Sequence, residues 1–336
     1  MTSNKEPLCY KSDFGDARLD NRLNRIVNTL VDHGTAGIRS SFGDEHQIKS
    51  VYRFMSPEKV TFSGLESSEQ SRLYEVLDAQ KPPLLIHLQD TTTFKYSQKQ
   101  SRQELPCLNY INHRGYFLHN SILLDEKGNV LGLSQQELWG RSEKDLGRSR
   151  SQRTPRNLPV ECQESERFVR HFQDFECLMQ SFPESQGISV CDREGDFYEL
   201  LSAKSVSNVD LWVRVHHDRL IQTLEGTSQK LLTAVGQSPI LGEYWTEILV
   251  KGSTHQTRPV CLTVRICPIG VVLPESLKWS KTTSKSAKKR TAESQELPFW
   301  VVQVTEKNPP AGVEPIEWTL LTTRPLRDYW DALQIV

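Results

Sequence analysis

The chain has 336 residues, of which 37% are hydrophobic and 25% are charged, and its formal net charge is −1. This composition is ordinary for a soluble globular protein, and a length above about 300 residues favours two or three domains. No run of about 18 apolar residues is present, which argues against a membrane-spanning helix. The first residues, MTSNKEPLCYKSDF, lack the apolar core of a secretory signal, and the seven scattered cysteines, none in a CxxC pair, are expected to be reduced thiols.

The first 80 residues show helical periodicity. The segment RLDNRLNRIVNTLVDH repeats apolar residues at spacings of three and four, which is typical of an amphipathic helix. Asp13 is expected to cap this helix, and Gly34 lies just past its end. HQIKSVYRFM predicts a second helix, and a third is expected from about Thr61 to Ala79. Together these segments predict a small all-helical unit.

The pattern changes after residue 80. LLIHLQD (84–90) predicts a strand that ends at Asp90, and SILLDEKGNVLGLSQQEL predicts a hairpin that turns at Lys127–Asn129. Glu164–Met179 predicts an amphipathic helix, and GISVCDREGDFYELL (187–201) predicts a short strand that passes directly into a helix. Alternation of this kind indicates a mixed sheet with helices on its faces.

The next hundred residues predict strands with no helices between them. The segments are DLWVRVHHDRLI, EYWTEILV, RPVCLTVRICPIGVVLP and LPFWVVQVTE. WTLLTT (318–323) predicts one more strand, and RDYWDALQIV (327–336) predicts the beginning of a helix. A simple strand–helix alternation does not account for this series.

Asp90 and Asp192 occupy equivalent places, because each follows an apolar strand and is expected at its C-terminal edge. Ligands bind at that edge in open sheets of this class. Each residue also has a structural alternative: Asp192 as the N-cap of a helix and Asp90 as part of an Asx-turn with the threonines that follow it. Two carboxylates on neighbouring strands favour a site for Mg²⁺ or Mn²⁺, which prefer oxygen ligands. A pair of such ions about 4 Å apart is typical of phosphoryl-transfer sites.

Two other features are weaker. The basic runs 141–156 and 278–290 are poor in apolar residues, so they predict solvated loops while leaving nucleic acid open as a partner. A metal-hydrolase site built from His216, His217, Asp218 and His255 has no HExxH-type spacing to support it. Exposed or structural histidines are the favoured interpretation there.

Several of these stretches together resemble IS4-type transposases, the group that includes the Tn5 transposase. The stretches are GDARLDNRLNRI, VYRFMSPEKV, LIHLQDTTTFKYS, SVCDREGDFYELL and PIEWTLLTTRPLRDYWDALQIV, so the similarity runs nearly end to end. The resemblance implies an α/β fold: an RNase H-like mixed-sheet core with a largely β insertion, preceded by a small all-helical DNA-binding domain. The implied boundaries are 1–80 for the helical domain, 81–208 for the first part of the core, 209–312 for the insertion and 313–336 for the return to the core.

The same resemblance implies the site chemistry. Asp90 and Asp192 would be catalytic ligands of a DDE triad that binds two Mg²⁺ or Mn²⁺ ions. These ions would activate water for strand nicking and then the DNA 3′-hydroxyl for hairpin formation or strand transfer. The third carboxylate of the family, a glutamate, lies in a helix reading Y-x-x-R-W-x-I-E beyond the segment that matches 327–336, and this sequence ends at Val336. The expectation is therefore a chain truncated before that glutamate, with little or no cleavage activity alone.

Several basic residues are expected to contact DNA. Arg18, Arg22 and Arg53 fall on positions of the helical domain that approach the transposon end, and Lys49 and Arg193 are further expected contacts. Phosphate contacts of this kind position the protein and carry no sequence information. An ordinary surface charge is the alternative for each of them.

Three acids close to Asp192 were considered as substitutes for the missing glutamate: Glu194, Asp196 and Glu199. Asp196 is the best placed if the segment is an α-helix, since a four-residue step returns to the same face.

The expected partners are double-stranded DNA, as transposon inverted-repeat ends and as target, and an intact transposase as a dimer partner. No membrane partner is expected, and the expected location is the nucleoid in a prokaryotic cytoplasm. The alternative function is a non-catalytic DNA-binding fragment that occupies transposon ends and inhibits the intact enzyme.

Overall fold

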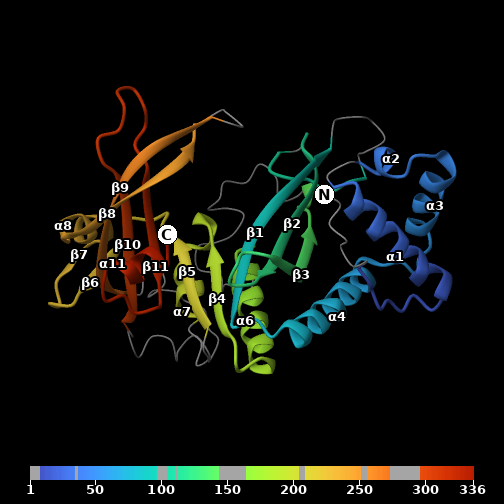
Figure 1. Cartoon of the computed structure of the whole chain (residues 1–336), viewed down its shortest axis with the longest axis horizontal. Helices are drawn as coiled ribbons and strands as arrows, with labels where there is room; N and C mark the ends of the chain where they lie inside the picture. The colour runs from blue at the N-terminus through green and yellow to red at the C-terminus, as the bar shows by residue number, and fades with distance from the viewer. Residues whose placement is uncertain are drawn as a thin grey trace.

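The computed structural model describes residues 8–34, 37–96, 104–110, 112–143, 164–203, 209–250, 256–272 and 296–336. A group of short helices lies at one end of the molecule, and a long mixed sheet occupies the rest (Figure 1). The N-terminal helices are α1 (Ala17–Asp32), α2 (Ile38–Ser41), α3 (Glu45–Met55) and α4 (Phe62–Gln80). The predicted arrangement of a helical N-terminal region followed by a mixed α/β sheet is confirmed.

Local capping sets the ends of these helices. Asp16 is the N-cap of α1, and its carboxylate accepts a hydrogen bond from the backbone N–H of Arg18 at 2.9 Å. The prediction that Asp13 caps this helix is wrong, because the chain turns at Gly15, where φ is +67°, before the helix begins. Gly34 follows the end of α1 with a φ of +62°, as predicted. A φ in this region strains any residue with a side chain, which explains the glycine.

The helical unit has its own small core. Buried apolar side chains from the segment before α1, from α1 itself and from α3 pack together, including Phe14, Leu23 and Phe54. The chain before α1 is held by two asparagines one turn apart on that helix. Asn24 and Asn28 each accept a hydrogen bond from a backbone N–H and donate one to a backbone C=O of that chain, at 2.6 to 2.9 Å. The two side-chain amides therefore form the hydrogen bonds with this segment that the backbone of a neighbouring strand would otherwise form.

The sheet of eleven strands is continuous through the described residues. Its order is β3-β2-β1-β4-β5-β11-β10-β9-β6-β7, and β8 pairs with β9 beside this path. The strands are β1 (Leu84–Tyr96), β2 (Arg114–Leu124), β3 (Val130–Trp139), β4 (Gln186–Cys191), β5 (Val209–Arg214), β6 (Leu220–Thr223), β7 (Ser228–Lys230), β8 (Ile240–Leu249), β9 (Thr257–Val271), β10 (Leu297–Glu306) and β11 (Glu317–Thr322). Only the β1–β4 and β4–β5 pairs are parallel.

The helices of the sheet region are α6 (Glu166–Ser181), α7 (Tyr198–Ser202), α8 (Leu231–Gln237) and α11 (Tyr329–Leu333), with a 3₁₀ turn at Arg193–Gly195. α8 interrupts the series that was predicted to contain strands alone. This prediction was wrong because α8 is a seven-residue helix, which is too short to show helical periodicity. β5 pairs with β4, and β11 returns beside β5, so the segment predicted as an insertion shares its sheet with the rest.

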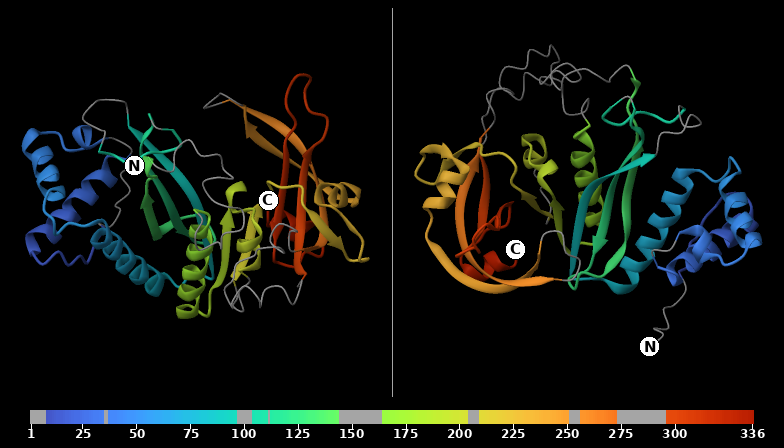
Figure 2. Two further views of the ribbon diagram at one scale, coloured as in Figure 1. Left: turned by 180° about the vertical axis from the view of Figure 1, so that it is seen from behind. Right: turned by 90° about the horizontal axis from the view of Figure 1, so that it is seen from above.

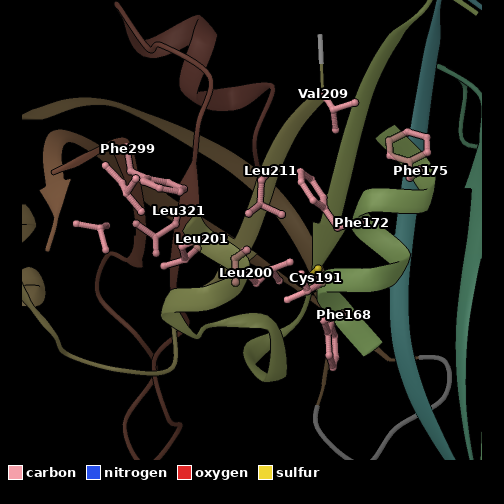
Figure 3. Close-up of a cluster of buried hydrophobic side chains, with 14 of the residues drawn as sticks. Phe168, Phe172, Phe175, Cys191, Leu200, Leu201, Val209, Leu211, Phe299 and Leu321 are labelled. Carbon is pink, nitrogen blue, oxygen red and sulfur yellow. The ribbon is translucent and has the colours of Figure 1, made fainter. Parts of the chain in front are cut away.

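One apolar core runs beneath most of this sheet. Phe172 and Phe175 of α6 meet Leu200 and Leu201 of α7 against the strands, and Phe299 of β10 belongs to the same cluster (Figure 3). A smaller cluster on β9, β10 and the C-terminal segment includes the buried face of α11. Full burial of a large apolar side chain stabilises the fold by about 1.5–3 kcal/mol, so these clusters fix the positions of the central strands.

Helix α4 packs along β3, the strand at one edge of the sheet. Along the edge strand β3, Glu69 accepts a hydrogen bond from Leu133 N–H at 3.1 Å, and Glu66 accepts one from Gln136 N–H at 3.0 Å. Arg72 donates to the Leu131 carbonyl at 2.8 Å. Unpaired groups on an edge strand invite unwanted pairing with other chains. The side chains of α4 satisfy several of these groups and attach the helical unit to the sheet. The ribbons of α4 and β3 lie side by side (Figure 2).

Candidate functional site

Asp90 lies within β1, and Asp192 directly follows β4, the strand that pairs with β1. β1 and β4 are parallel, and the last residues paired between them are Gln89 and Cys191. The two aspartates follow this same rung. Gln89 and Cys191 are buried, whereas Asp90 and Asp192 are exposed, as expected because successive side chains of a strand point to opposite faces. The two carboxylates therefore share one face of the sheet at one level along the strands.

Asp90 does not end its own strand. β1 continues to Tyr96 and pairs with β2, where Asp90 lies opposite Asn120. The prediction of a strand that ends at Asp90 is wrong, and the same pairing rules out the alternative of a turn. The reason is that β2 gives the threonine-rich half of β1 a partner, and threonine suits a strand because it is β-branched. What ends near Asp90 is the parallel pairing with β4.

Asp192 has the N-cap role that was the structural alternative for it in the sequence. Its carboxylate caps the 3₁₀ turn by accepting a hydrogen bond from Glu194 N–H at 2.8 Å through Oδ1. No described group bonds its other oxygen, Oδ2. The cap holds the carboxylate in place while leaving an oxygen open to solvent.

Asp196 cannot serve beside Asp192. The chain between them forms a 3₁₀ turn in place of the predicted α-helix, so the four-residue step onto one face does not exist. The Asp196 side chain is fully buried and forms an ion pair with Arg219. Its Oδ2 also accepts hydrogen bonds from the backbone N–H groups of His216 and His217, at 2.6 and 2.8 Å. This carboxylate fastens the end of β4 to the loop after β5.

The histidine site that the sequence disfavoured gains no support from the described residues. Asp218 accepts a hydrogen bond from Leu232 N–H at 2.9 Å at the start of α8, which is a structural role. His255 lies outside the described residues. Across the described ranges, no group of three or more His, Cys, Asp or Glu side chains is placed to hold a metal ion.

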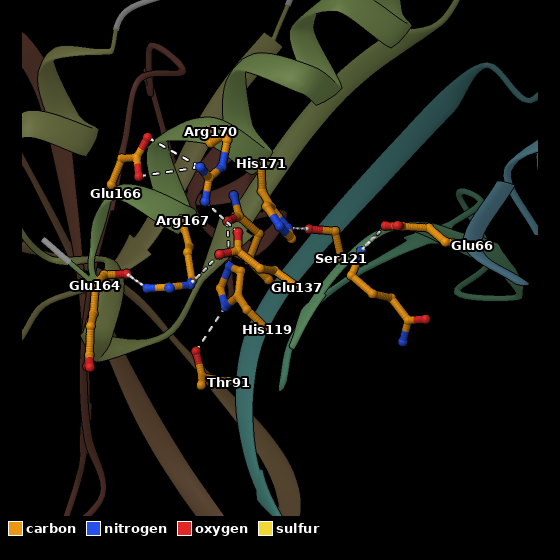
Figure 4. A network of polar contacts seen from close by, with 12 residues as sticks. Glu66, Thr91, His119, Ser121, Glu137, Glu164, Glu166, Arg167, Arg170 and His171 are labelled. Carbon is orange, nitrogen blue, oxygen red and sulfur yellow. Dashed lines mark hydrogen bonds and ion pairs between the residues drawn. The ribbon is translucent and has the colours of Figure 1, made fainter. Parts of the chain in front are cut away.

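A buried polar network lies on the face of the sheet that α6 covers (Figure 4), and it includes Gln89, the residue before Asp90. Its core consists of three histidines: His87 on β1, His119 on β2 and His171 on α6, which are all 0–1% exposed. The pKa of His87 is lowered to about 3, that of His119 to about 4 and that of His171 to about 2, mainly by burial and in part by nearby histidines or arginines. All three side chains are therefore neutral at pH 7. No periodic pattern in the sequence indicated this network, because histidine occurs in many environments.

Charged residues close the outer end of the same network. Glu137 on β3 forms ion pairs with Arg167, at 2.8 Å, and with Arg170, both on α6. Arg141 forms a two-pronged contact with Glu164, at 2.6 and 2.7 Å. These pairs fix the first turn of α6 against β3. Arg141 is consequently engaged within the protein, while the remainder of the basic run 144–156 and the whole of 278–290 lie outside the described residues.

The basic residues expected to contact DNA lie mostly on the surface of the helical unit. Arg18 and Arg22 are one turn apart on α1, and Lys49 and Arg53 are one turn apart on α3. Arg18 pairs with Asp16 at 3.5 Å, and Lys49 pairs with Glu45 at 3.4 Å. Both pairs are largely exposed, so they contribute little to stability and can exchange for phosphate contacts.

The remaining candidates have fewer contacts. Arg53 is exposed and Arg22 is half-buried, and neither forms an ion pair with any described residue. Arg193 is exposed beside Asp192, on the 3₁₀ turn and far in sequence from the helical unit. Arg25, Arg39 and Lys59 are further exposed basic residues of this unit that the sequence reasoning did not single out.

No helix of the described residues is long and apolar enough to cross a membrane. In the comparison with protein families, a match falls on the helical unit. Residues 5–60 match the family model of the transposase DNA-binding domain. This range includes α1, α2 and α3 together with four of the five residues expected to contact DNA. The helical end of this chain is therefore similar to the DNA-binding domain of transposases, and DNA is the partner that this similarity supports.

Proposed function

We propose that the chain is a DNA transposase of the IS4 type, which binds transposon inverted-repeat ends through its helical unit. Asp90 and Asp192 are proposed as two carboxylates of an RNase H-like DDE site for cutting and joining DNA. The observation that supports this best is the β1–β4 register, which brings these two carboxylates to one face of the sheet. The match of residues 5–60 supplies the DNA-binding part of the proposal.

Mg²⁺ or Mn²⁺ is the metal that suits this pair. Magnesium commonly keeps several waters and binds proteins through one or two carboxylates together with substrate phosphates. Asp90 and Asp192 fit that donor set, since both are exposed and Asp192 keeps an oxygen unbonded within the described residues. When bound, such an ion would activate water and stabilise charge on the phosphate. The resemblance implies a third carboxylate, and no described residue completes a group of three here.

The DNA-binding part is tested with a triple variant, Arg18→Gln/Arg22→Gln/Arg53→Gln. The probe is a duplex of each inverted repeat that flanks the coding region, measured by gel shift at several salt concentrations. Each lost phosphate contact is expected to lower the slope of log K against log salt by about 0.9. The matched control is Lys127→Gln/Arg327→Gln, which removes two exposed charges from the sheet region. Equal slopes for wild type and the triple variant would contradict the assigned contacts.

The metal site is tested with Asp90→Asn and Asp192→Asn. Each variant removes one negative oxygen donor, so each is expected to weaken Mn²⁺ binding by at least about tenfold, measured by calorimetry or electron paramagnetic resonance. Glu126→Gln, an exposed acid on the β2–β3 turn, is the control and should keep the wild-type affinity. Unchanged Mn²⁺ affinity in both aspartate variants would refute the site.

The same two measurements distinguish an active transposase from the second candidate function, a non-catalytic DNA-binding protein. A non-catalytic protein that occupies transposon ends needs the helical unit and not the aspartate pair. It would bind the repeats with wild-type affinity in Asp90→Asn and would show no Mn²⁺ binding that depends on Asp90. The observation in its favour is that the family match covers the DNA-binding unit.

A further inference from the structure

Gln89 stands at the point where the two aspartate-bearing strands part. It forms the last β1–β4 rung together with Cys191, and Asp90 follows it directly. Beyond this rung β4 turns into the 3₁₀ segment, so no further backbone pairing with β1 holds Asp192. Whatever fixes the distance between the two carboxylates must therefore act at or before this rung.

The side chain of Gln89 points away from the carboxylates and into the core, where it is 3% exposed. Its Nε2 donates a hydrogen bond to Ser189 Oγ on β4 at 3.2 Å, and its Oε1 accepts one from His119 Nε2 on β2 at 3.3 Å. A single amide thus bridges three adjacent strands. Ser189 and His119 are both completely buried.

The hydrogen-bond directions form one consistent chain. Gln89 Oε1 can only accept, so His119 carries its proton on Nε2, and its Nδ1 accepts from the Thr91 hydroxyl at 2.9 Å. Ser189 accepts from Gln89 and can then donate its own proton to His87 Nδ1 at 3.0 Å. Thr91 and Gln89 flank Asp90 on β1, so both neighbours of the aspartate are tied to partners across the sheet.

Burying so many polar groups has a cost that apolar residues would avoid. Burying a polar side chain costs free energy unless the side chain is hydrogen-bonded. A network whose hydrogen bonds are all satisfied mainly serves to specify one arrangement of the strands. A slip of one residue between strands would move every side chain to the opposite face. Donor and acceptor groups that fit only in one register prevent such a slip, which apolar side chains would tolerate.

We propose that Gln89 is a positioning residue of the candidate site, and that its amide holds β1 and β4 in the register that sets Asp90 beside Asp192. This inference rests on the proposed function, because a positioning role for Gln89 requires that Asp90 and Asp192 bind metal together. Gln89 lies on the opposite face and touches neither carboxylate's open side, so it acts through the strands and is not a catalytic residue.

The test uses Gln89→Met, which keeps the length of the side chain and removes both hydrogen bonds. Ser189→Ala is a milder second variant that removes the partner hydroxyl with little change in volume. Both are expected to lower Mn²⁺ affinity about tenfold, the lower end of the range for residues that orient metal ligands. The control is Gln303→Met, a glutamine of β10 that is equally buried at 6% exposure and remote from the pair. It should lose stability in urea as Gln89→Met does, with wild-type Mn²⁺ affinity.

The outcomes separate this inference from the proposal beneath it. Wild-type Mn²⁺ affinity in Gln89→Met and Ser189→Ala, with affinity lost in Asp90→Asn, overturns the positioning role and leaves the metal site standing. Unchanged affinity in Asp90→Asn overturns the metal site and the positioning role with it. A tenfold loss in Gln303→Met as well would show that general loosening of the sheet is the cause, and would also overturn the inference.

Discussion

Lowering the pH from 6.5 to 5 is expected to reduce the free energy of unfolding by about 2 kcal/mol for each of His87, His119 and His171. Burial lowers the pKa of each histidine to about 4 or below in the folded state, against about 6.5 in the unfolded chain. The unfolded chain therefore binds more protons in this window. The histidines' contribution is complete above about pH 6.5 and is lost progressively as the pH falls toward the folded-state values.

The window between pH 6.5 and 5 isolates the histidines, because unperturbed carboxyl groups titrate near pH 4. His171→Asn tests the assignment: Asn can retain a bond to Ser121, whose Oγ lies 2.7 Å from His171 Nδ1, and Nε2 has no described partner to lose. This variant is expected to lose about one third less stability over the window, measured by urea unfolding at each pH. His33→Asn is the exposed control. An identical pH dependence in His171→Asn and wild type would contradict the prediction.

The second large effect is expected at Asp196. Replacing it by alanine should lower the free energy of unfolding by about 3–5 kcal/mol, because Arg219 and two backbone N–H groups would remain buried without their acceptor. The Arg219 side chain is only 14% exposed. Its pKa is lowered by burial, while Asp196 acts in the opposite direction. Urea unfolding at pH 7 measures the change.

A double variant distinguishes two free energies: the cost of leaving one buried charge without its partner, and the net contribution of the ion pair to stability. Asp196→Leu/Arg219→Met removes both charges, and replacing a whole buried pair by apolar groups is often close to neutral. It should therefore be more stable than Asp196→Ala. Glu45→Ala, which breaks an exposed pair with Lys49, should change stability little. A double variant as unstable as Asp196→Ala would show that the backbone contacts of Asp196, and not its charge pairing, carry the effect.

Both predictions concern residues that the sequence could not place. Asp196 was considered as a metal ligand on the assumption of a continuous helix after Asp192, and its true partners lie 20 to 23 positions along the chain. The histidine network joins β1, β2, β4 and α6, with partners up to 102 positions apart. Contacts at such separations leave no local pattern in a single sequence.

The sequence by itself determined the local features. Helical periodicity located α1, α3 and α4, and glycine or threonine marked an end of two of them, because caps and turns depend on residues within a few positions. The Lys127–Asn129 turn was predicted for the same reason, since Gly128 adopts a φ of +78° there. The two aspartates were singled out from equally local evidence, because each directly follows a run rich in apolar residues, LLIHLQ before Asp90 and GISVC before Asp192.

Only the tertiary structure decided how these pieces meet. It placed Asp90 and Asp192 directly after the last paired rung of the parallel β1–β4 ladder, carried β1 past Asp90 to Tyr96 and buried Asp196 in an ion pair. Strand pairing, edge covering and burial depend on which distant segments become neighbours, and the free energy of that choice comes from packing summed over the whole chain. The aspartate pair was visible in the sequence as two residues. The placement of both residues next to the last β1–β4 rung exists only in the folded sheet.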